Sequence, residues 1–277
     1  MKAVRFEDPA KEIRVGSLED DGVVHDAGPA GPRGFVASDE AWDALASGSG
    51  RVYRRDEVKL LHPVVPRKIL AIGLNYRSHA EESELDVPSV PVVFAKLPSA
   101  LIGDREEIVI PHEETRPDFE GELAVVIGRR TYRAQPSEAR SAIGGIAALN
   151  DVSGRRAQLE TPLRQFTLGK SFDTFSPMGP CIASLDGIDL TDIEVRTTVS
   201  GEVMQDANTR DLIFPVDRLI AYLSAGVTLE PGDVIATGTP GGVGDSRQPP
   251  RYLREGDLVE VYVSGVGTLT NPVRMER

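Results

Sequence analysis

The chain has 277 residues, of which 40% are hydrophobic and 27% are charged, a composition typical of a globular protein with one large domain or a large domain and a small one. Its 43 acidic and 31 basic residues leave a net charge of −12, which argues against nucleic acid as the main partner. No apolar run approaches the ~20 residues of a membrane span and the charged first residues do not resemble a signal peptide, so we expect a cytoplasmic protein with no membrane partner.

The first sixty residues predict a small β-rich domain. Short alternating stretches separated by turn residues indicate strands over 2–6, 12–18 and 22–25. A helical pattern follows over 38–46, and it begins with the capping residue Ser38. Two prolines within 61–68 then discourage both a helix and a central strand. We therefore expect an N-terminal domain over residues 1–60 and a main domain over residues 65–277.

The main domain consists mostly of apolar, strand-like runs. These runs are KILAIGLNY, VPVVFAK, GELAVVIG, IGGIAALNDVS, DVIATGTP and DLVEVYVSGVGTLTNPV. Two helices are expected, over 137–142 and 215–226, and the second has helical spacing of Leu219, Ile220 and Leu223. Because strands outnumber helices, we expect a β-rich α+β fold with a mixed or antiparallel sheet folded into a roll or barrel, and not a doubly wound α/β sheet.

A pair of carboxylates indicates a metal site. Glu120 and Glu122 precede the apolar run LAVVIG, and in an extended chain they point to one face about 6.6 Å apart, where they repel each other. The alternative is a solvent-exposed strand end. The single cysteine, Cys181, leaves oxygen or histidine ligands, so Mg²⁺ or Mn²⁺ is the natural cation. Asp151 ends another apolar run and would supply a third ligand, leaving one face of the cation open.

Three further groups of residues could take part in chemistry. His79 and Glu82 share one surface of a short helix, where the carboxylate can orient the imidazole as a general base, unless they are simply a solvated pair. Lys170 is one of six lysines against 25 arginines, so its placement between glycine and serine indicates a compact point charge or chance. The segment 238–242 around Thr239 offers backbone N–H groups to a carboxylate, or is a tight turn.

Six segments in this order resemble the fumarylacetoacetate hydrolase superfamily. They are ILAIGLNYRSHAEE, PDFEGELAVVIG, NDVSGR, QFTLGKSFDTFSPMGP, LEPGDVIATGTPGGVG and GDLVEVYVSGVGTLTNPV. The resemblance covers residues 65–277, and the first sixty residues resemble the small N-terminal domain of many bacterial members. It implies a β-sandwich roll, a divalent metal that is usually Mg²⁺ or Mn²⁺, and a homodimer.

The resemblance also implies roles for individual residues. The metal ligands would be Glu120, Glu122 and Asp151. The catalytic residues would be His79 and Glu82, a dyad on a mobile lid that activates water, and Lys170. The substrate contacts would be Tyr76, Arg155, Gln158 and Thr239. Fumarylacetoacetase itself has a further metal aspartate where this chain reads Gly73-Leu74-Asn75, so the chain looks closer to the smaller acylpyruvase and decarboxylase members.

These observations predict an enzyme that acts on a small 2-oxo or 2,4-dioxo acid. Because His79 and Glu82 are both present, we expect hydrolytic cleavage of a C–C bond in an acylpyruvate-like substrate. The alternatives are decarboxylation or tautomerisation of oxaloacetate and isomerisation of 2-hydroxyhepta-2,4-diene-1,7-dioate, which need the same metal site. A protein of a different class, which binds a metal without turnover, is a further alternative.

Overall fold

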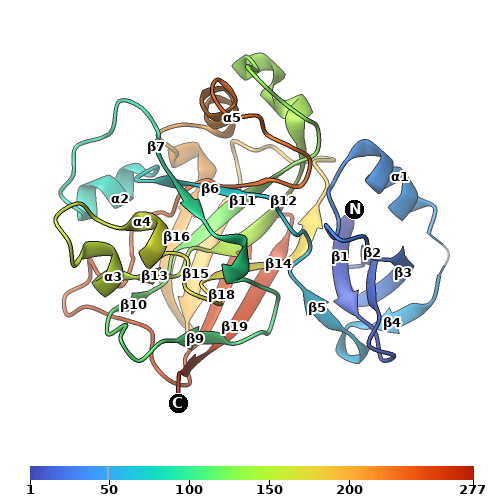
Figure 1. Ribbon diagram of the computed structural model, residues 1–277, viewed down its shortest axis with the longest axis horizontal. Helices are drawn as coiled ribbons and strands as arrows, with labels where there is room; N and C mark the ends of the chain where they lie inside the picture. The colour runs from blue at the N-terminus through green and yellow to red at the C-terminus, as the bar shows by residue number, and fades with distance from the viewer. Residues whose placement is uncertain (49) are drawn as a thin grey trace.

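The computed structural model describes residues 1–48 and 50–277, in which strands dominate and the helices are short (Figure 1). The strands are β1 (Lys2–Glu7), β2 (Ile13–Leu18), β3 (Val23–Pro29), β4 (Val52–Arg54), β5 (Lys59–Leu61), β6 (Ile69–Gly73), β7 (Val92–Lys96), β8 (Leu101–Ile102), β9 (Ile108–Ile110), β10 (Pro117–Asp118), β11 (Gly121–Ile127), β12 (Ile143–Asn150), β13 (Ser153–Gly154), β14 (Ser176–Ala183), β15 (Glu194–Val199), β16 (Glu202–Asn208), β17 (Val234–Ala236), β18 (Leu258–Val263) and β19 (Gly267–Met275). The α-helices are α1 (Asp39–Ala46), α2 (Arg77–Glu82), α3 (Arg155–Leu159), α4 (Phe166–Gly169) and α5 (Val216–Ser224). The 3-10 helices are η1 (Arg55–Glu57), η2 (Pro98–Ala100), η3 (Pro136–Ala142) and η4 (Thr209–Asp211).

The strands form two large sheets and one small pair. The larger sheet follows the order β4-β3-β2-β1-β14-β12-β11-β17-β6-β7, with β5 beside β1 and β8 beside β14. The second sheet follows the order β16-β15-β18-β19-β9, and β10 pairs with β13. Both large sheets are mixed, because β17 runs parallel to β6 and β19 runs parallel to β9 among antiparallel neighbours. This architecture confirms the predicted β-rich α+β fold.

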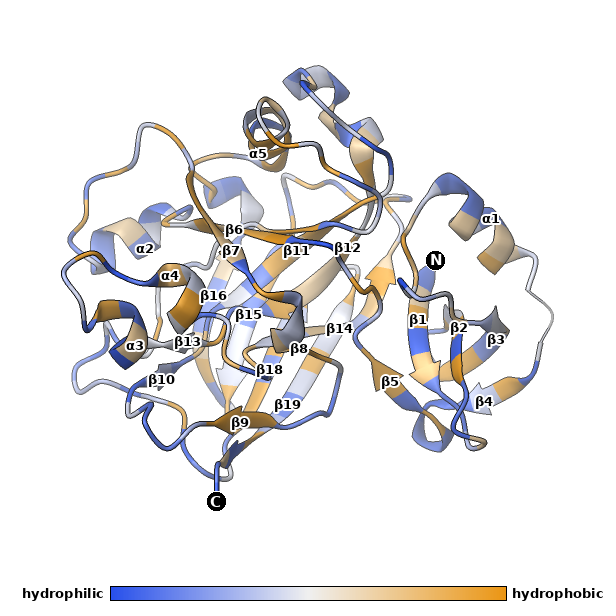
Figure 2. Cartoon of the chain, viewed as in Figure 1, coloured by the Kyte–Doolittle hydropathy of each residue, from blue (hydrophilic) through white to orange (hydrophobic). Residues whose placement is uncertain are grey.

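Strand β11 lies between two hydrophobic cores, and all seven of its residues are buried. On one face, Leu123, Val125 and Ile127 pack in a core that also holds residues of the second sheet, so the two sheets form a sandwich. On the other face, Ala124 and Val126 belong to a second core. Burial on both faces explains why residues 123–127 form a continuous apolar run and do not alternate with polar residues. Figure 2 shows the hydropathy of each residue, with both hydrophobic and hydrophilic segments on the central strands.

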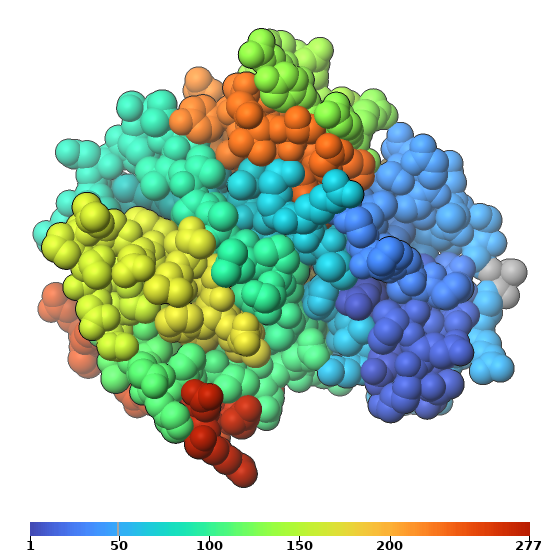
Figure 3. Space-filling view, in the orientation of Figure 1, coloured from blue at the N-terminus to red at the C-terminus, as the bar shows by residue number. Residues whose placement is uncertain are grey.

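The N-terminal segment forms the lobe at the right of Figures 1 and 3, with β1 to β5 and α1. The three predicted N-terminal strands are present as β1, β2 and β3. Ser38 caps α1 by accepting a hydrogen bond from the N–H of Ala41 at 3.3 Å. The lobe shares the larger sheet with the rest of the chain, because Ala3 of β1 pairs with Ile182 of β14. The division into residues 1–60 and 65–277 stays a prediction.

One of the two helices predicted in the main domain differs from expectation. The helix expected over 215–226 is α5, whose Leu219, Ile220 and Leu223 are buried as their spacing predicts. The segment expected to be helical at 137–142 is the 3-10 helix η3, which starts at Pro136 and leads directly into β12. Across residues 1–48 and 50–277, no helix is both long enough and apolar enough to cross a membrane.

Candidate metal centre and active site

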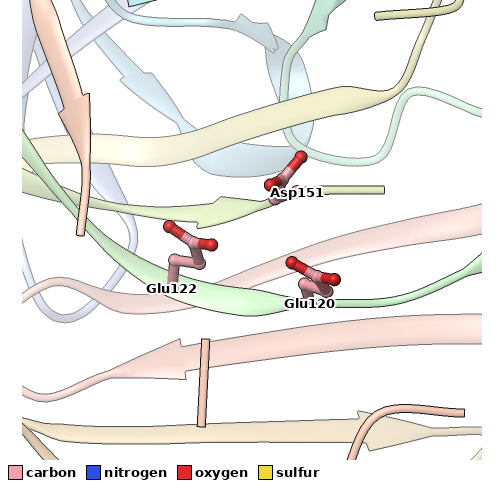
Figure 4. A group of neighbouring side chains, drawn as sticks. All are labelled: Glu120, Glu122 and Asp151. Atoms are coloured by element: carbon pink, nitrogen blue, oxygen red, sulfur yellow. The ribbon is translucent and has the colours of Figure 1, made fainter. Parts of the chain in front are cut away.

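The three predicted metal ligands lie together. Glu122 belongs to β11, Glu120 precedes that strand, and Asp151 directly follows the neighbouring strand β12. The pairing of the two strands brings the side chains into register, and the Asp151 N–H donates to the Glu120 carbonyl at 2.8 Å. All three are buried, and each offers a carboxylate oxygen within 4.8 Å of the others. Figure 4 shows their carboxylates gathered on one side of β11.

The electrostatics of this cluster fit a divalent cation. Burial raises the pKa of Glu122 well above its usual value, and the nearby Asp151 and Glu120 carboxylates raise it further. The backbone N–H of Gly238 donates to Oε2 of Glu122 at 2.8 Å and only partly opposes this rise. Buried carboxylates that repel one another are stabilised by a cation, and an all-oxygen set of ligands suits Mg²⁺ or Mn²⁺. The residues present therefore fit the predicted cofactor.

Lys170 and Arg155 hold Glu120 in its ionised form. The ammonium Nζ of Lys170 lies 2.8 Å from Oε2 of Glu120 and 2.8 Å from Oδ2 of Asp151. Arg155 donates to Oε1 of Glu120 at 2.6 Å. Burial opposes ionisation of Glu120, but the charges of Lys170 and Arg155 outweigh it and lower the pKa of Glu120 to about 2. Burial likewise disfavours the Lys170 ammonium, yet the carboxylates of Asp151 and Glu120 raise its pKa overall.

Arg155 and Gln158 lie beside the cluster on α3. Arg155 donates to Oδ2 of Asp118 at 2.9 Å and to Oε1 of Gln158 at 3.0 Å, in addition to Glu120. Each of the three guanidinium nitrogens therefore has a partner in the protein, although both side chains line the cavity described below. Their expected role in substrate contact stays a prediction, and the structure gives Arg155 a second task in holding two buried carboxylates.

His79 and Glu82 form the expected pair on α2. The Nδ1 atom of His79 lies 2.7 Å from Oε1 of Glu82, and the second oxygen of Glu82 accepts from the N–H of Gly242 at 2.6 Å. A carboxylate can only accept a hydrogen bond, so Nδ1 carries the hydrogen and Nε2 is left as a proton acceptor. The imidazole is thereby fixed in both orientation and tautomer.

The glycine-rich segment 238–244 holds carboxylates of the protein itself. The backbone N–H groups of Gly238, Gly242 and Gly244 donate at 2.6 to 2.8 Å to Glu122, Glu82 and Asp118, respectively. Gly238 and Gly242 have φ values of +104° and +102°, which favour glycine. We expected residues 238–242 to hold a substrate carboxylate, and this stays a prediction. The N–H groups of Gly242 and Gly238 link Glu82 of α2 and Glu122 of the carboxylate cluster to this segment.

Thr239 and Tyr76 differ in their suitability as substrate contacts. The Thr239 side chain lines the cavity, where its hydroxyl donates to the Gly121 carbonyl at 3.0 Å and accepts from Gln205 at 2.7 Å. Tyr76 lies fully buried in the core between the sheets and is not part of the cavity wall. Burial raises the pKa of its hydroxyl. Tyr76 is the N-cap residue of α2, and its ring packs in the core. Its position therefore does not support the expected contact with substrate.

A cavity of about 610 Å³ brings most of the predicted site together. Its polar lining includes His79, Glu82, Glu120, Arg155, Gln158, Lys170 and Thr239. An apolar wall is formed by Ile72, Leu74, Leu85, Val92, Phe94, Leu159, Phe166 and Val243. The volume and the mixed polar and apolar lining are those of a site for a small molecule.

The sequence interpretation assigned no role to two residues that build this site. Lys96 is fully buried against Asp151 at the end of β7, and its rarity as one of six lysines is the same signal that singled out Lys170. Asn75 is also buried, and its amide donates to the carbonyls of Phe214 and Thr237 at 3.1 and 2.7 Å. It thereby fixes the base of α2, and no sequence pattern indicated this.

The chain is similar to several known proteins. It is 41% identical over 224 residues to "Oxaloacetate tautomerase FAHD2A, mitochondrial" from Bos taurus, which covers 80% of this chain and 71% of the relative. The solved structure of 5-carboxymethyl-2-hydroxymuconate delta-isomerase from Mycobacterium smegmatis matches with a TM-score of 0.83 and 36% identity over 100% of both chains. The structure of 2-hydroxyhepta-2,4-diene-1,7-dioate isomerase from Mycobacterium marinum matches with a TM-score of 0.81 and 33% identity, over 100% of this chain and 99% of that one.

A family match covers the part of the chain that contains the cavity. Residues 68–274 match the family described as fumarylacetoacetate (FAA) hydrolase C-terminal. This range includes all the residues of the carboxylate cluster and the dyad, together with both large sheets except for the N-terminal strands. The chain therefore belongs to the fumarylacetoacetate hydrolase family.

Proposed function

We propose that the protein is an enzyme that moves a proton within a 2-oxo acid, by keto–enol tautomerisation or double-bond isomerisation, with Mg²⁺ or Mn²⁺ as cofactor. The bovine relative is named an oxaloacetate tautomerase and the two solved relatives are named isomerases, which supports this reaction class. These names favour our alternative over the hydrolytic C–C cleavage that the His79–Glu82 pair first led us to expect.

The dyad is the observation that carries the proposal. Because Nδ1 of His79 donates to Glu82, its Nε2 is free to take a proton from the carbon beside the 2-oxo group. His79 lines the same cavity as Glu120 and Lys170. The carboxylate of Glu82 stabilises the imidazolium that forms, and returning this proton to the other end of the enolate completes an isomerisation without water.

Glu120, Glu122 and Asp151 would hold the cofactor. A divalent cation bound there supplies a Lewis acid for the 2-oxo group and its neighbouring carboxylate. Lys170 stays protonated because Asp151 and Glu120 raise its pKa despite burial, and it places a positive charge at the polar end of the cavity. Phe94 and Phe166 lie with ring centres 5.5 Å apart and tilted by 32° in the apolar wall of the cavity.

Enol oxaloacetate tests this function directly, because its conversion to the keto form removes an ultraviolet absorbance. We expect the protein to accelerate this decay with Mg²⁺ or Mn²⁺ and to lose the activity when a chelator is added. Parallel assays measure release of CO₂ from oxaloacetate and cleavage of acylpyruvates. Cleavage of acylpyruvates without tautomerisation of oxaloacetate would favour the C–C hydrolase. Metal binding without turnover of any of these substrates would favour a metal-binding protein that is not an enzyme.

Assembly and location remain proposals as well. We propose a homodimer, and support comes from exposed apolar side chains near β7, which has only β6 as a partner among the described residues; they include Leu85, Val87, Val90, Val92 and Val93. Sedimentation velocity would give the mass in solution. A cytoplasmic location stays a prediction, because the name of the bovine relative places that protein in mitochondria.

A further inference from the structure

Lys96 is a buried amine that the proposed mechanism does not use. It is the last residue of β7 and is 1% exposed. Its Nζ lies 2.5 Å from Oδ1 of Asp151 and also donates to the backbone carbonyl of Lys170. Burial lowers the pKa of this amine, although Asp151 opposes the change. A lysine buried to this degree is costly unless its donors are well paired, so both contacts matter to the fold around it.

Lys96 contacts the proposed metal ligand Asp151 but does not line the substrate cavity. Asp151 turns Oδ2 toward Lys170, which lines the cavity, and Oδ1 toward Lys96, which does not. One side chain therefore connects the ends of three elements: β7, β12 and α4. The next residue reinforces this junction, because the N–H of Leu97 donates to Oγ of Ser171 at 3.0 Å.

A fixed donor at one oxygen of a carboxylate restricts the orientations that its other oxygen can take. Lys96 imposes this restraint on Asp151, and by holding the carbonyl of Lys170 it also fixes the backbone from which that ammonium reaches Glu120 and Asp151. Partners of this kind, which contact a ligand and not the metal, typically contribute about 10- to 100-fold to metal affinity.

We propose that Lys96 is a positioning residue that orients Asp151 for the divalent cation and Lys170 for the substrate. The inference rests on the metal site of the proposed function, but it does not depend on which reaction follows. Its test is therefore the binding of Mn²⁺ to the metal-free full-length chain, measured by isothermal titration calorimetry and by the electron paramagnetic resonance of free Mn²⁺.

Two variants of Lys96 and one control separate orientation from general stability. Lys96→Met keeps the length of the side chain but removes its donors, so we expect the dissociation constant of Mn²⁺ to rise about 10- to 100-fold. Lys96→Gln keeps a neutral donor toward Asp151, and we expect a smaller rise, of at least about threefold, because neutral hydrogen bonds are weaker than charge-assisted ones. Lys68→Met is the matched control, since Lys68 pairs with the buried Asp233 and neither residue lines the cavity.

The control should lower the melting temperature without changing Mn²⁺ affinity. If Lys96→Met does not fold, Lys96→Gln decides the outcome by itself. Wild-type Mn²⁺ affinity in either folded Lys96 variant overturns the positioning role, and leaves the proposed tautomerase intact if oxaloacetate is still turned over by the wild type. A wild-type protein that binds no Mn²⁺ overturns the metal site and this role together.

Discussion

Nδ1 of His79 and Oε1 of Glu82 lie 2.7 Å apart on adjacent turns of α2. The second oxygen of the same carboxylate is held by the N–H of Gly242, which lies 160 residues further along the chain. The helix that carries the candidate base is thus joined to the segment whose Gly238 holds Glu122 of the metal cluster. The position of the base relative to the metal cluster therefore depends on hydrogen bonds between these two segments.

Replacing His79 tests its role as the general base. We expect His79→Ala to lower kcat for enol oxaloacetate about 10²- to 10⁴-fold, the usual contribution of a positioned base. Mn²⁺ affinity should not change, because His79 is not among the three proposed ligands. Glu82→Gln should have a milder effect, since it weakens the orientation of the imidazole without removing it. His112→Ala, at an exposed histidine outside the cavity, is the control, and unchanged kcat in His79→Ala would sink the dyad mechanism.

Glu122→Gln should separate stability from metal binding. Burial and the charges of Asp151 and Glu120 raise the pKa of Glu122, so its protonated form stabilises the metal-free protein at low pH. This stability is lost as the pH rises above the unfolded value of about 4.3 toward the folded pKa. The neutral glutamine removes the loss, so we expect the metal-free variant to melt above the wild type at neutral and alkaline pH, while Mn²⁺ affinity falls.

The partner variant Glu120→Gln should behave in the opposite way. Glu120 is paired with Lys170 and Arg155, so its loss leaves two buried cations with fewer partners and should lower the melting temperature. Differential scanning calorimetry after treatment with a chelator compares the three proteins. Equal destabilisation by both substitutions would contradict the electrostatic description of the cluster.

We expect that position 121 must be glycine, because the second sheet approaches the backbone there too closely for a larger side chain. A Cβ atom at this position would lie 2.0 Å from Oγ1 of Thr197, which is buried and has no hydrogen-bond partner among the described residues. We expect Gly121→Ala to destabilise the protein by about 1–3 kcal/mol, whereas Thr197→Ala should be nearly neutral. The double variant should recover a large part of the loss, since the clashing atom is gone. Urea unfolding of the wild type, the two single variants and the double variant gives the four free energies of this double-mutant cycle. Strictly additive changes would show that the two residues do not interact in this way.

Cys181 should make the free energy of unfolding decrease as the pH rises in the alkaline range. Burial raises the pKa of its thiol to about 12. The folded state therefore keeps a proton that the unfolded state loses near pH ~8.5, so this stabilisation is complete below that pH and declines as the pH rises toward 12. We expect the free energy of unfolding to fall by up to about 1.4 kcal/mol per pH unit more in the wild type than in Cys181→Ala. Urea titrations from neutral to alkaline pH give both slopes, and parallel curves would refute the prediction.

The sequence by itself determined the class of fold and the members of the carboxylate cluster. Strand alternation has a period of two along neighbouring residues, so β1 and β2 were predictable, and β11 was predictable as a short continuous apolar run. The same period predicts that Glu120 and Glu122 share a face. The scarcity of lysine identified Lys170, and the same argument extends to Lys96.

Only the tertiary structure decided what surrounds these residues. The sequence cannot show that β11 pairs with β12 in the register that places Asp151 beside Glu120, or that the N–H of Gly238 reaches Glu122 across 116 residues. It also did not show that Tyr76 packs in the core. Hydrogen bonds and burial of this kind depend on contacts between distant segments, whereas strand periodicity depends on adjacent residues. This is why the carboxylates of the cluster could be predicted, but the backbone donors and the strand register that place them could not.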